Sequence, residues 1–425
     1  MRSQWAYSWV MVLLHSKKPT LIFLTLISII NLMGLVWVSM PQMSLGLLSL
    51  VLMSLVAMKL MDSVKSGVLL LGFSLYVILM TLGLLGWIGL TPDSVSALAW
   101  VVVMTMMMSH LIHFIAALLR AMARGSFQHD AIAEALGQTH QPILLSSLTT
   151  VVGFAVAAYF DAHYVNMAVI VAVGVLFSYL VVLSWLPWVL LNWLLEFRVG
   201  QYEDRHGLSF VAKSLEHNLM LRRGLTLIGF LLAAWAVFQL IEQFDAMRAV
   251  LTMIAASFFL LLFAWRNLKV ALVATLIGCL SVIVILSPMH WIHVISALSP
   301  FVLVVPMGIV LDDVVHFFSR YLKAEQSFFS KHEDKTRFAL ASVGRSIWLT
   351  SQLLIVGLLV LLFSDNELIR QASVMTILSI LLVSFLLLSV MPSIAKIKLR
   401  GSNRYGNYCC GRIKYRWSTN GLRYS

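Results

Sequence analysis

Long apolar runs, separated by short polar turns, follow one another along almost the whole chain. A helix of roughly 20 apolar residues crosses a hydrocarbon core about 30 Å thick. The runs have this length and no strand-like alternation, so they predict membrane-spanning helices and not a barrel. The expected spans are 20–40, 44–60, 66–87, 97–119, 143–160, 165–195, 225–241, 249–265, 270–287, 294–319, 347–363 and 371–395. The fold class is therefore an all-α polytopic membrane protein with about twelve transmembrane helices.

Composition and charge support this fold class. Of the 425 residues, 60% are hydrophobic and 11% are charged, whereas soluble domains carry about 25% charged residues. A water-soluble fold is thus excluded. The pI of about 9.8 does not indicate nucleic acid as a partner, because the basic residues form short clusters between apolar runs, as topology signals do.

The distribution of basic residues predicts the orientation of the chain. If the N-terminus is cytoplasmic, the outer loops hold only Arg248 and Arg370 of the 30 Lys and Arg residues. The first apolar run is too long for a signal peptide and is expected to remain as an uncleaved helix. We expect a multi-pass protein of the bacterial inner (cytoplasmic) membrane with both termini in the cytoplasm.

The two halves of the chain repeat one another. The segment 109–114 aligns with 312–317 at a spacing of 203, and 143–147 aligns with 347–351 at a spacing of 204. Six spans per half predict a parallel repeat, and such repeats place their functional site at the interface between halves. The expected division is a first six-helix repeat at 1–195, a cytoplasmic linker at 196–224, a second six-helix repeat at 225–398 and a basic cytoplasmic tail at 399–425.

Asp312 and Asp313 are the acidic residues that the expected spans place inside the membrane, out of 18 in the chain. A carboxylate in hydrocarbon costs roughly 3 kcal/mol or more on insertion scales, so such acids usually face the bundle interior and mark ion or proton paths. Two adjacent carboxylates also repel, which favours a proton on one of them near neutral pH. The alternative is an inert pair that is satisfied by hydroxyls or reaches toward the inner interface.

The segment Gly308–Tyr321, with the sequence GIVLDDVVHFFSRY, resembles the fourth-helix motif of the resistance-nodulation-division (RND) superfamily, in its MMPL-like, sterol-sensing-domain branch. The first half resembles the same branch from His110 to Arg120 and from Ala131 to Phe160. The resemblance implies that Asp312 and Asp313 bind and release protons, and that the proton gradient drives export of lipids or other hydrophobic molecules.

Two departures from the family pattern affect this expectation. The large porter domains that the family carries after the first helix of each half have no counterpart, because only residues 41–43 and 242–248 stand there. In the first half, Ser109 and His110 occupy the acidic positions. Proton coupling is therefore expected to rest on the second half alone.

Three histidines are candidates for proton coupling beside the acids. His316 lies four residues after Asp312 and three after Asp313, so a helix places all three on neighbouring faces. It could relay protons or simply fix a carboxylate rotamer. His110 and His113 stand in the equivalent helix, and if the two fourth helices face each other as in the resembled family, His110 is expected to face the acids. No motif fixes a metal geometry, so we expect no metal and no other cofactor.

Backbone breakers and hydroxyls are candidates for supporting the acidic pair. Pro306 and Gly308 precede the pair in its helix and favour a break beside the carboxylates, or merely a bend. Hydroxyls of both halves could donate hydrogen bonds toward the site, namely Thr350, Ser351, Ser146, Ser147, Thr149 and Thr150, although packing of small residues explains them equally well. Ser109, at the acidic position of the first half, is a further supporting candidate.

Two amphipathic segments, Ala123–Gln141 and Glu325–Arg345, are expected to lie along the cytoplasmic interface. The tail after Arg400 is expected to be disordered and to bind anionic headgroups.

The leading hypothesis is an RND/MMPL-like transporter or exporter component, proton-coupled, for a lipid-like or hydrophobic small-molecule substrate. The alternative is a non-transporting, sterol-sensing-like lipid-binding regulator or scaffold. The expected partners are membrane lipids and a separate porter-like or periplasmic protein. An enzyme is not expected, because no nucleophile and base stand together inside the membrane apart from the Asp and His cluster.

Overall fold

A computed structural model describes residues 4–38, 44–61, 63–93, 96–192, 219–241, 243–292, 299–326 and 332–391. All regular structure in these ranges is helical, which confirms the fold class. Eleven helices of the described chain are long and apolar enough to cross a membrane, and a twelfth contributes the shorter apolar stretch Leu227–Ile241.

The helices fall into two series, one in each half of the chain. The first series is α1 (Gln4–His15), α2 (Lys17–Leu32), η1 (Met33–Trp37), α3 (Ser44–Met61), α4 (Val64–Trp87), α5 (Ala97–Ala123), α6 (Gln128–Phe160), η3 (Ala162–Tyr164), α7 (Val165–Leu183) and α8 (Trp185–Asn192). The second series is α10 (Leu219–Ile241), α11 (Phe244–Trp265), α12 (Leu268–Trp291), α13 (Pro300–Gln326), α14 (His332–Leu361), α15 (Glu367–Phe385) and the π-helical turn η4 (Leu386–Val390).

The sequence repeat has a counterpart in the bounds of the helices. The helices α4 and α12 both have 24 residues and begin 204 positions apart, and α5 and α13 both have 27 residues and begin 203 apart. Ser63 and Asn267 precede α4 and α12, and each side chain accepts a hydrogen bond from a backbone N–H of the first turn. Of the expected linker 196–224, residues 196–218 lie outside the described residues and α10 already begins at Leu219, while the expected tail 399–425 lies wholly outside them.

The fifth helix of the first half is longer than the sequence predicted. The expected interfacial segment Ala123–Gln141 is mostly the beginning of α6, which continues through Pro142 as one helix of 33 residues. A proline inside a helix leaves the carbonyl four residues earlier without its donor. That carbonyl belongs to Gln138, and Lys323 Nζ on α13 donates to it at 2.9 Å. The helix therefore persists because a side chain of another helix replaces the lost hydrogen bond.

The segment Glu325–Arg345 also differs from its expected form. Residues 327–331 lie outside the described chain, and α14 begins at His332, so Arg345 belongs to the membrane-crossing helix. The N-terminal helix α1 was not predicted from the sequence.

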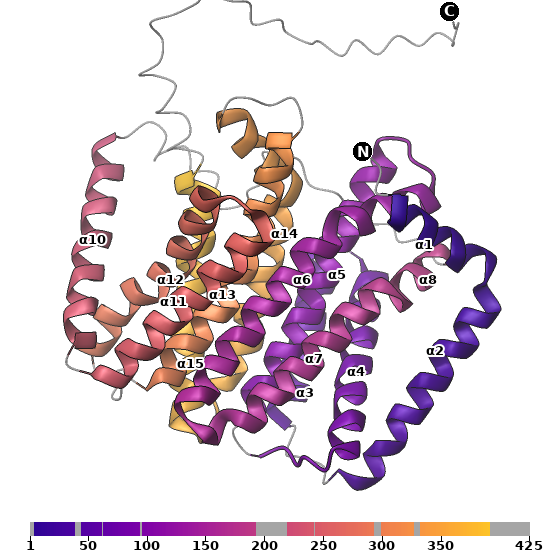
Figure 1. The fold of residues 1–425 in the computed structure, drawn as a ribbon, viewed down its shortest axis with the longest axis horizontal. Helices are drawn as coiled ribbons and strands as arrows, with labels where there is room; N and C mark the ends of the chain where they lie inside the picture. The colour runs from indigo at the N-terminus through magenta and orange to yellow at the C-terminus, as the bar shows by residue number, and fades with distance from the viewer. Residues whose placement is uncertain are drawn as a thin grey trace, which may run out of the picture.

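The two fourth helices form the centre of the bundle. All of the apolar window of α13 and 94% of that of α5 are buried, whereas the corresponding share for α2 is 11%. Figure 1 shows α5, α6 and α13 in the middle of the bundle and α2 and α10 at opposite edges. The central position of α13 keeps its polar side chains away from lipid.

Two glycines allow α6 and α13 to pack with their backbones in contact. A Cβ added to Gly308 would lie 3.0 Å from Gly153 Cα and 3.1 Å from the carbonyl oxygen of Thr149. Small residues permit such close approach between membrane helices. This contact fixes α13 against the first half of the chain just one turn before the acidic pair.

Candidate functional site

Asp312 lies between the two halves of the chain and accepts hydrogen bonds from the first half. Ser109 Oγ on α5 donates to Asp312 Oδ2 at 2.8 Å, and Ser146 Oγ on α6 donates to Oδ1. His316 Nε2, one turn further along α13, lies 3.5 Å from Oδ1 without forming a hydrogen bond. Asp312 is only 8% exposed, so the two serine hydroxyls replace the water that a carboxylate normally binds.

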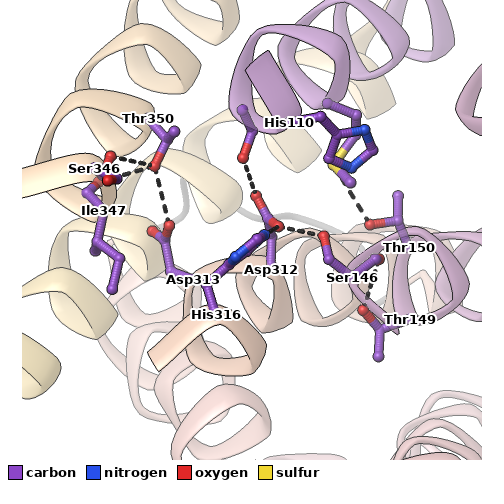
Figure 2. Close-up of polar contacts among 12 residues, drawn as sticks. His110, Ser146, Thr149, Thr150, Asp312, Asp313, His316, Ser346, Ile347 and Thr350 are labelled. Carbon is purple, nitrogen blue, oxygen red and sulfur yellow. Dashed lines mark hydrogen bonds and ion pairs between the residues drawn. The ribbon is translucent and has the colours of Figure 1, made fainter. Parts of the chain in front are cut away.

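Asp313 turns in another direction and binds the second half. Thr350 Oγ1 and Ser351 Oγ on α14 donate to its two carboxylate oxygens at 3.1 and 2.8 Å. Ser351 Oγ also lies 2.8 Å from Ser384 Oγ on α15. Figure 2 shows the two carboxylates pointing to opposite sides, Asp312 toward Ser146 and Asp313 toward Thr350. The adjacent acids therefore link α13 directly to α5, α6 and α14, and Ser351 extends the network to α15.

The hydroxyls around Asp313 have alternative acceptors within reach. Thr350 Oγ1 lies 3.0 Å from the carbonyl oxygens of Ser346 and Ile347, and Ser351 Oγ lies 2.7 Å from that of Ile347. A hydroxyl has a single proton to donate, so each must choose between the carboxylate and its own helix backbone. These hydroxyls can follow a change in the protonation of Asp313 with only a rotation of the side chain.

Two histidines stack where the fourth helices meet. The rings of His113 and His316 are 3.6 Å apart at an angle of 2° between their planes. They occupy equivalent positions of the two repeats, as do Ser109 and Asp312, which lie one turn away. Both ring nitrogens of His113 are buried without a hydrogen-bond partner. Equivalent positions of the two repeats thus meet at two successive levels, and the line that passes between the members of each pair is called the axis below.

His110 lies near enough to Asp312 for their charges to interact, but its hydrogen-bond contact is with another helix. Its Nδ1 lies 2.7 Å from Ser178 Oγ on α7, and its Nε2 has no hydrogen-bond partner. Successive helical residues are rotated by about 100°, so only one of Ser109 and His110 can point at the axis. Ser109 takes that place, and His110 faces its own half, just as Asp313 does.

The supporting residues have different surroundings. Thr350 and Ser351 contact Asp313, as described above. Pro306 does not break α13, which runs as one helix from Pro300 to Gln326. Gly308 serves the close contact with α6, and Thr150 Oγ1 lies 3.5 Å from its carbonyl oxygen. Of the two alternatives, a break beside the carboxylates is therefore wrong, and Gly308 contributes through packing.

Basic side chains lie on the other side of the histidines from the acids. Arg320, two turns after Asp312, is 5% exposed, and its Nη1 donates to Gln138 Oε1 at 2.8 Å. Arg120 Nη2 on α5 is buried and has no hydrogen-bond partner. Gln138 accepts from both Arg320 and Lys323, so one residue of α6 anchors the end of α13 through its side chain and its backbone.

A small cavity reaches both carboxylates from the side of α14 and α15. Its walls include Thr105 and Ser109 on α5, Ile309 on α13, Leu354 on α14 and Ile380 on α15. It has room for about one water molecule, and the hydroxyls and carboxylates that line it can hydrogen-bond to one. The opposite side, where α6 contacts Gly308, is closed by backbone. Access to the acids is therefore asymmetric.

Sequence reasoning missed the outer members of the hydrogen-bond network. Ser178 and Ser384 stand in the sixth helix of each half, where serines are ordinary packing residues. Their signal is weak, because only the approach of α7 and α15 to the fourth helices gives them partners. Within the described part of the chain, no group of three or more His, Cys, Asp or Glu is placed to hold a metal ion.

Two adjacent serines on α6 allow a matched test of the Asp312 contacts. Ser146 donates to Asp312, whereas the hydroxyl of its neighbour Ser147 is buried without a partner. We expect Ser146→Ala to destabilise the protein by about 1 to 3 kcal/mol, because a buried carboxylate loses a donor. Ser147→Ala should be neutral or slightly stabilising. Thermal unfolding of the purified variants checks this, and equal effects would contradict the assigned contact.

No family model matches the sequence, and no curated protein matches it. Several solved structures are similar to the fold of this chain. SecDF from Thermus thermophilus, a translocon-associated membrane protein, superimposes with a TM-score of 0.68 at 14% identity, covering 84% of this chain and 62% of SecDF. SecDF in its super-membrane-facing form gives a TM-score of 0.66 at 13% identity, covering 84% of this chain and 62% of that chain.

A eukaryotic protein has the same arrangement of helices. The hedgehog release protein Disp from the water bear Hypsibius dujardini gives a TM-score of 0.65 at 10% identity, covering 87% of this chain and 71% of Disp. The present chain thus spans about three-fifths of the length of SecDF. At these identities the likeness concerns the fold alone. The chain is a multi-pass membrane protein whose helices are arranged as in SecDF and Disp.

Proposed function

We propose that this protein is a proton-coupled transporter or exporter component for a lipid-like or hydrophobic substrate, with Asp312 and Asp313 as the groups that bind and release protons. One observation carries the proposal. Two adjacent carboxylates are buried where the two halves meet. Four hydroxyl groups donate hydrogen bonds to them. Acids in such positions of membrane proteins usually serve ion or proton movement.

The hydroxyl contacts supply a way for protonation to change helix packing. A charged Asp313 attracts the hydroxyl protons of Thr350 and Ser351 and so ties α13 to α14. A protonated Asp313 releases them to the carbonyls of Ser346 and Ile347. The two protonation states thus make different contacts between helices, and such a difference is what shifts a conformational equilibrium.

Proton binding rests on the second half of the chain in this proposal. Asp312 and Asp313 both belong to α13, and Ser109 faces Asp312 from α5 as a hydrogen-bond donor. His316 and His113 lie next on the axis and would pass protons between the acids and the basic end of α13. The proposal assigns no catalytic residue.

The orientation that we propose follows from the basic residues. With both termini in the cytoplasm of a bacterial cell, Lys323 and Arg320 mark the inner end of α13, and Thr105, Ile309 and Leu354 of the cavity wall lie on the outer side of the acids. Protons would then enter through the cavity and leave past the stacked histidines.

A second candidate is a lipid-binding regulator or scaffold that resembles a sterol-sensing domain and acts with a separate porter-like or periplasmic protein. The short connections favour it. Residues 38–43 join η1 to α3, and residues 242–243 join α10 to α11, so neither connection holds a domain. Substrate handling outside the membrane would then fall to another chain.

Proton flux in proteoliposomes tests the first candidate. The protein is reconstituted with a pH-sensitive dye inside, and a pH gradient is imposed with potassium and valinomycin to balance charge. We expect flux from the wild type and none above protein-free liposomes from the double variant Asp312→Asn, Asp313→Asn. Equal fluxes from the two proteins would overturn the proposal and leave the regulator as the better candidate.

A further inference from the structure

Each half of the bundle has an apolar crevice on its outer surface. The first lies between α4 and α8 and is lined by Leu69, Gly72, Phe73, Tyr76, Trp185 and Val189. The second lies between α10, α12 and α15, with Gly229, Val273, Leu276, Ile277, Leu280 and Phe385 in its walls. Their volumes are about 280 and 350 Å³, near the lower end of the range of about 300 to 1,000 Å³ of ordinary ligand sites.

The two crevices are copies of each other in the repeat. Four positions of α4 in the first crevice match four positions of α12 in the second at a constant spacing of 204, namely Leu69 with Val273, Gly72 with Leu276, Phe73 with Ile277 and Tyr76 with Leu280. The third and sixth helices of each half form the walls in both cases. A hollow that recurs at equivalent positions, although the side chains differ, is a property of the fold and not an accident of one packing defect.

A lysine stands at the same end of each crevice. Lys65 and Lys269 are also 204 apart, and each lies four residues before the first lining residue shared by the two crevices. Both side chains are exposed, and neither pairs with a carboxylate of the described chain. The first turns of α4 and α12 contain no acidic residue, so their free N–H groups add to the positive potential.

The dimensions match one leaflet of a bilayer. From Lys65 to Tyr76 the helix rises about 17 Å, and half of the hydrocarbon core is about 15 Å thick. A molecule with a negative headgroup at the lysine and a hydrocarbon chain along the helix would therefore end near the closed end of the crevice. The same length separates Lys269 from Leu280.

We propose that each half of the protein binds one anionic phospholipid, with an acyl chain in the crevice and the phosphate at Lys65 or Lys269. The inference stands apart from proton transport, because none of the lining residues belongs to the acidic site. It does offer a connection, since Phe385 of the second crevice adjoins Ser384, which contacts Ser351 beside Asp313.

The two sites differ at their closed ends. In the first, Trp185 Nε1 donates to Tyr76 Oη at 3.0 Å, and Tyr76 Oη lies 2.7 Å from Ser28 Oγ on α2, so a polar network ends the crevice. In the second, Leu280 replaces Tyr76 and the crevice is larger. We therefore expect the second site to hold the longer acyl chain.

Glycines make it possible to fill each crevice without disturbing the fold. A Cβ added to Gly72 or to Gly229 would meet no atom within 4 Å. Gly72→Trp and Gly229→Trp place an indole in the space proposed for the acyl chain, and either change also raises helix propensity. Leu75→Trp, on an exposed face of α4 outside the crevice, is the matched control.

Native mass spectrometry of the purified, delipidated protein with added phosphatidylglycerol or phosphatidylcholine tests the proposal. We expect two phosphatidylglycerol molecules on the wild type and on Leu75→Trp, one on either glycine variant and none on the double variant. Lys65→Gln and Lys269→Gln should each weaken one site about fivefold, since a lysine near an anionic headgroup contributes about 1 kcal/mol. Lys59→Gln, at the exposed end of α3, should change nothing.

Three results would overturn the inference. Retention of two lipids by the double glycine variant would show that the crevices are not the sites. Equal binding of phosphatidylcholine would show that the lysines do not select an anionic headgroup. Loss of lipid from Leu75→Trp equal to that from Gly72→Trp would show only a general effect on the lipid-facing surface.

Discussion

Replacing Asp313 alone with asparagine will stop proton flux as completely as replacing both carboxylates, and Asp312→Asn will do the same. We expect the acids to act in series, with Asp313 passing protons to Asp312, because only Asp312 lies beside His316. Asp313 is held by hydroxyls of the second half, whereas Asp312 faces Ser109, Ser146 and His316 at the interface. In this arrangement a proton that passes from the cavity to the histidines needs both carboxylates. Flux into dye-loaded proteoliposomes measures the effect.

The comparison of single variants separates a serial from a parallel arrangement. If either Asp312→Asn or Asp313→Asn retains about half of the wild-type flux, the acids work independently and the serial path is wrong. Ser147→Ala is a suitable control, because its hydroxyl is buried beside the site and contacts neither acid. It should conduct protons as the wild type does.

Replacing Gly308 with leucine is expected to have the largest effect on stability. A Cβ at this position already lies 3.0 Å from Gly153 Cα, 3.1 Å from Thr149 O and 3.4 Å from Thr150 O, and all three atoms belong to a helix backbone that cannot move aside locally. Overpacking of this kind costs about 1 to 3 kcal/mol and more where no side chain can yield. Thermal unfolding in detergent should show a large decrease in the midpoint for Gly308→Leu.

The matched control is a glycine in open space. Gly72→Leu adds the same side chain to a helix of the same bundle, where a Cβ meets nothing within 4 Å. Its midpoint should be unchanged or raised. Equal decreases for the two variants would contradict the assignment of Gly308 as the point where α13 touches α6.

The helices and the acidic pair could be predicted from the sequence because both depend on local signals. Apolar runs of membrane length gave spans close to the observed helices, and α3, expected at 44–60, is observed at Ser44–Met61. Carboxylates inside such an apolar run are easily recognised in the sequence. The alignment also predicted that Ser109 and Asp312 occupy equivalent positions of the two halves. In the structure these two residues are in contact.

The failures arose where one helix depends on another. Pro142 suggested a boundary, but Lys323 of α13 satisfies the carbonyl that the proline frees, and α6 continues. His110 was expected to face the acids, and it does lie near Asp312, but the sequence did not predict that its Nδ1 contacts Ser178 on α7. The two side chains concerned lie 68 and 185 positions from their partners in sequence. A local sequence pattern carries no information about such distant contacts.

The central claim is that the buried pair Asp312 and Asp313 takes up protons as a unit at the interface between the two halves. Infrared difference spectroscopy of the reconstituted protein between high and low pH observes this directly, since a protonated carboxyl group has its own C=O stretching band. We predict a carboxyl band in the wild type at low pH that is absent from the double variant Asp312→Asn, Asp313→Asn and persists in Ser147→Ala. A wild-type difference spectrum identical to that of the double variant would contradict the claim.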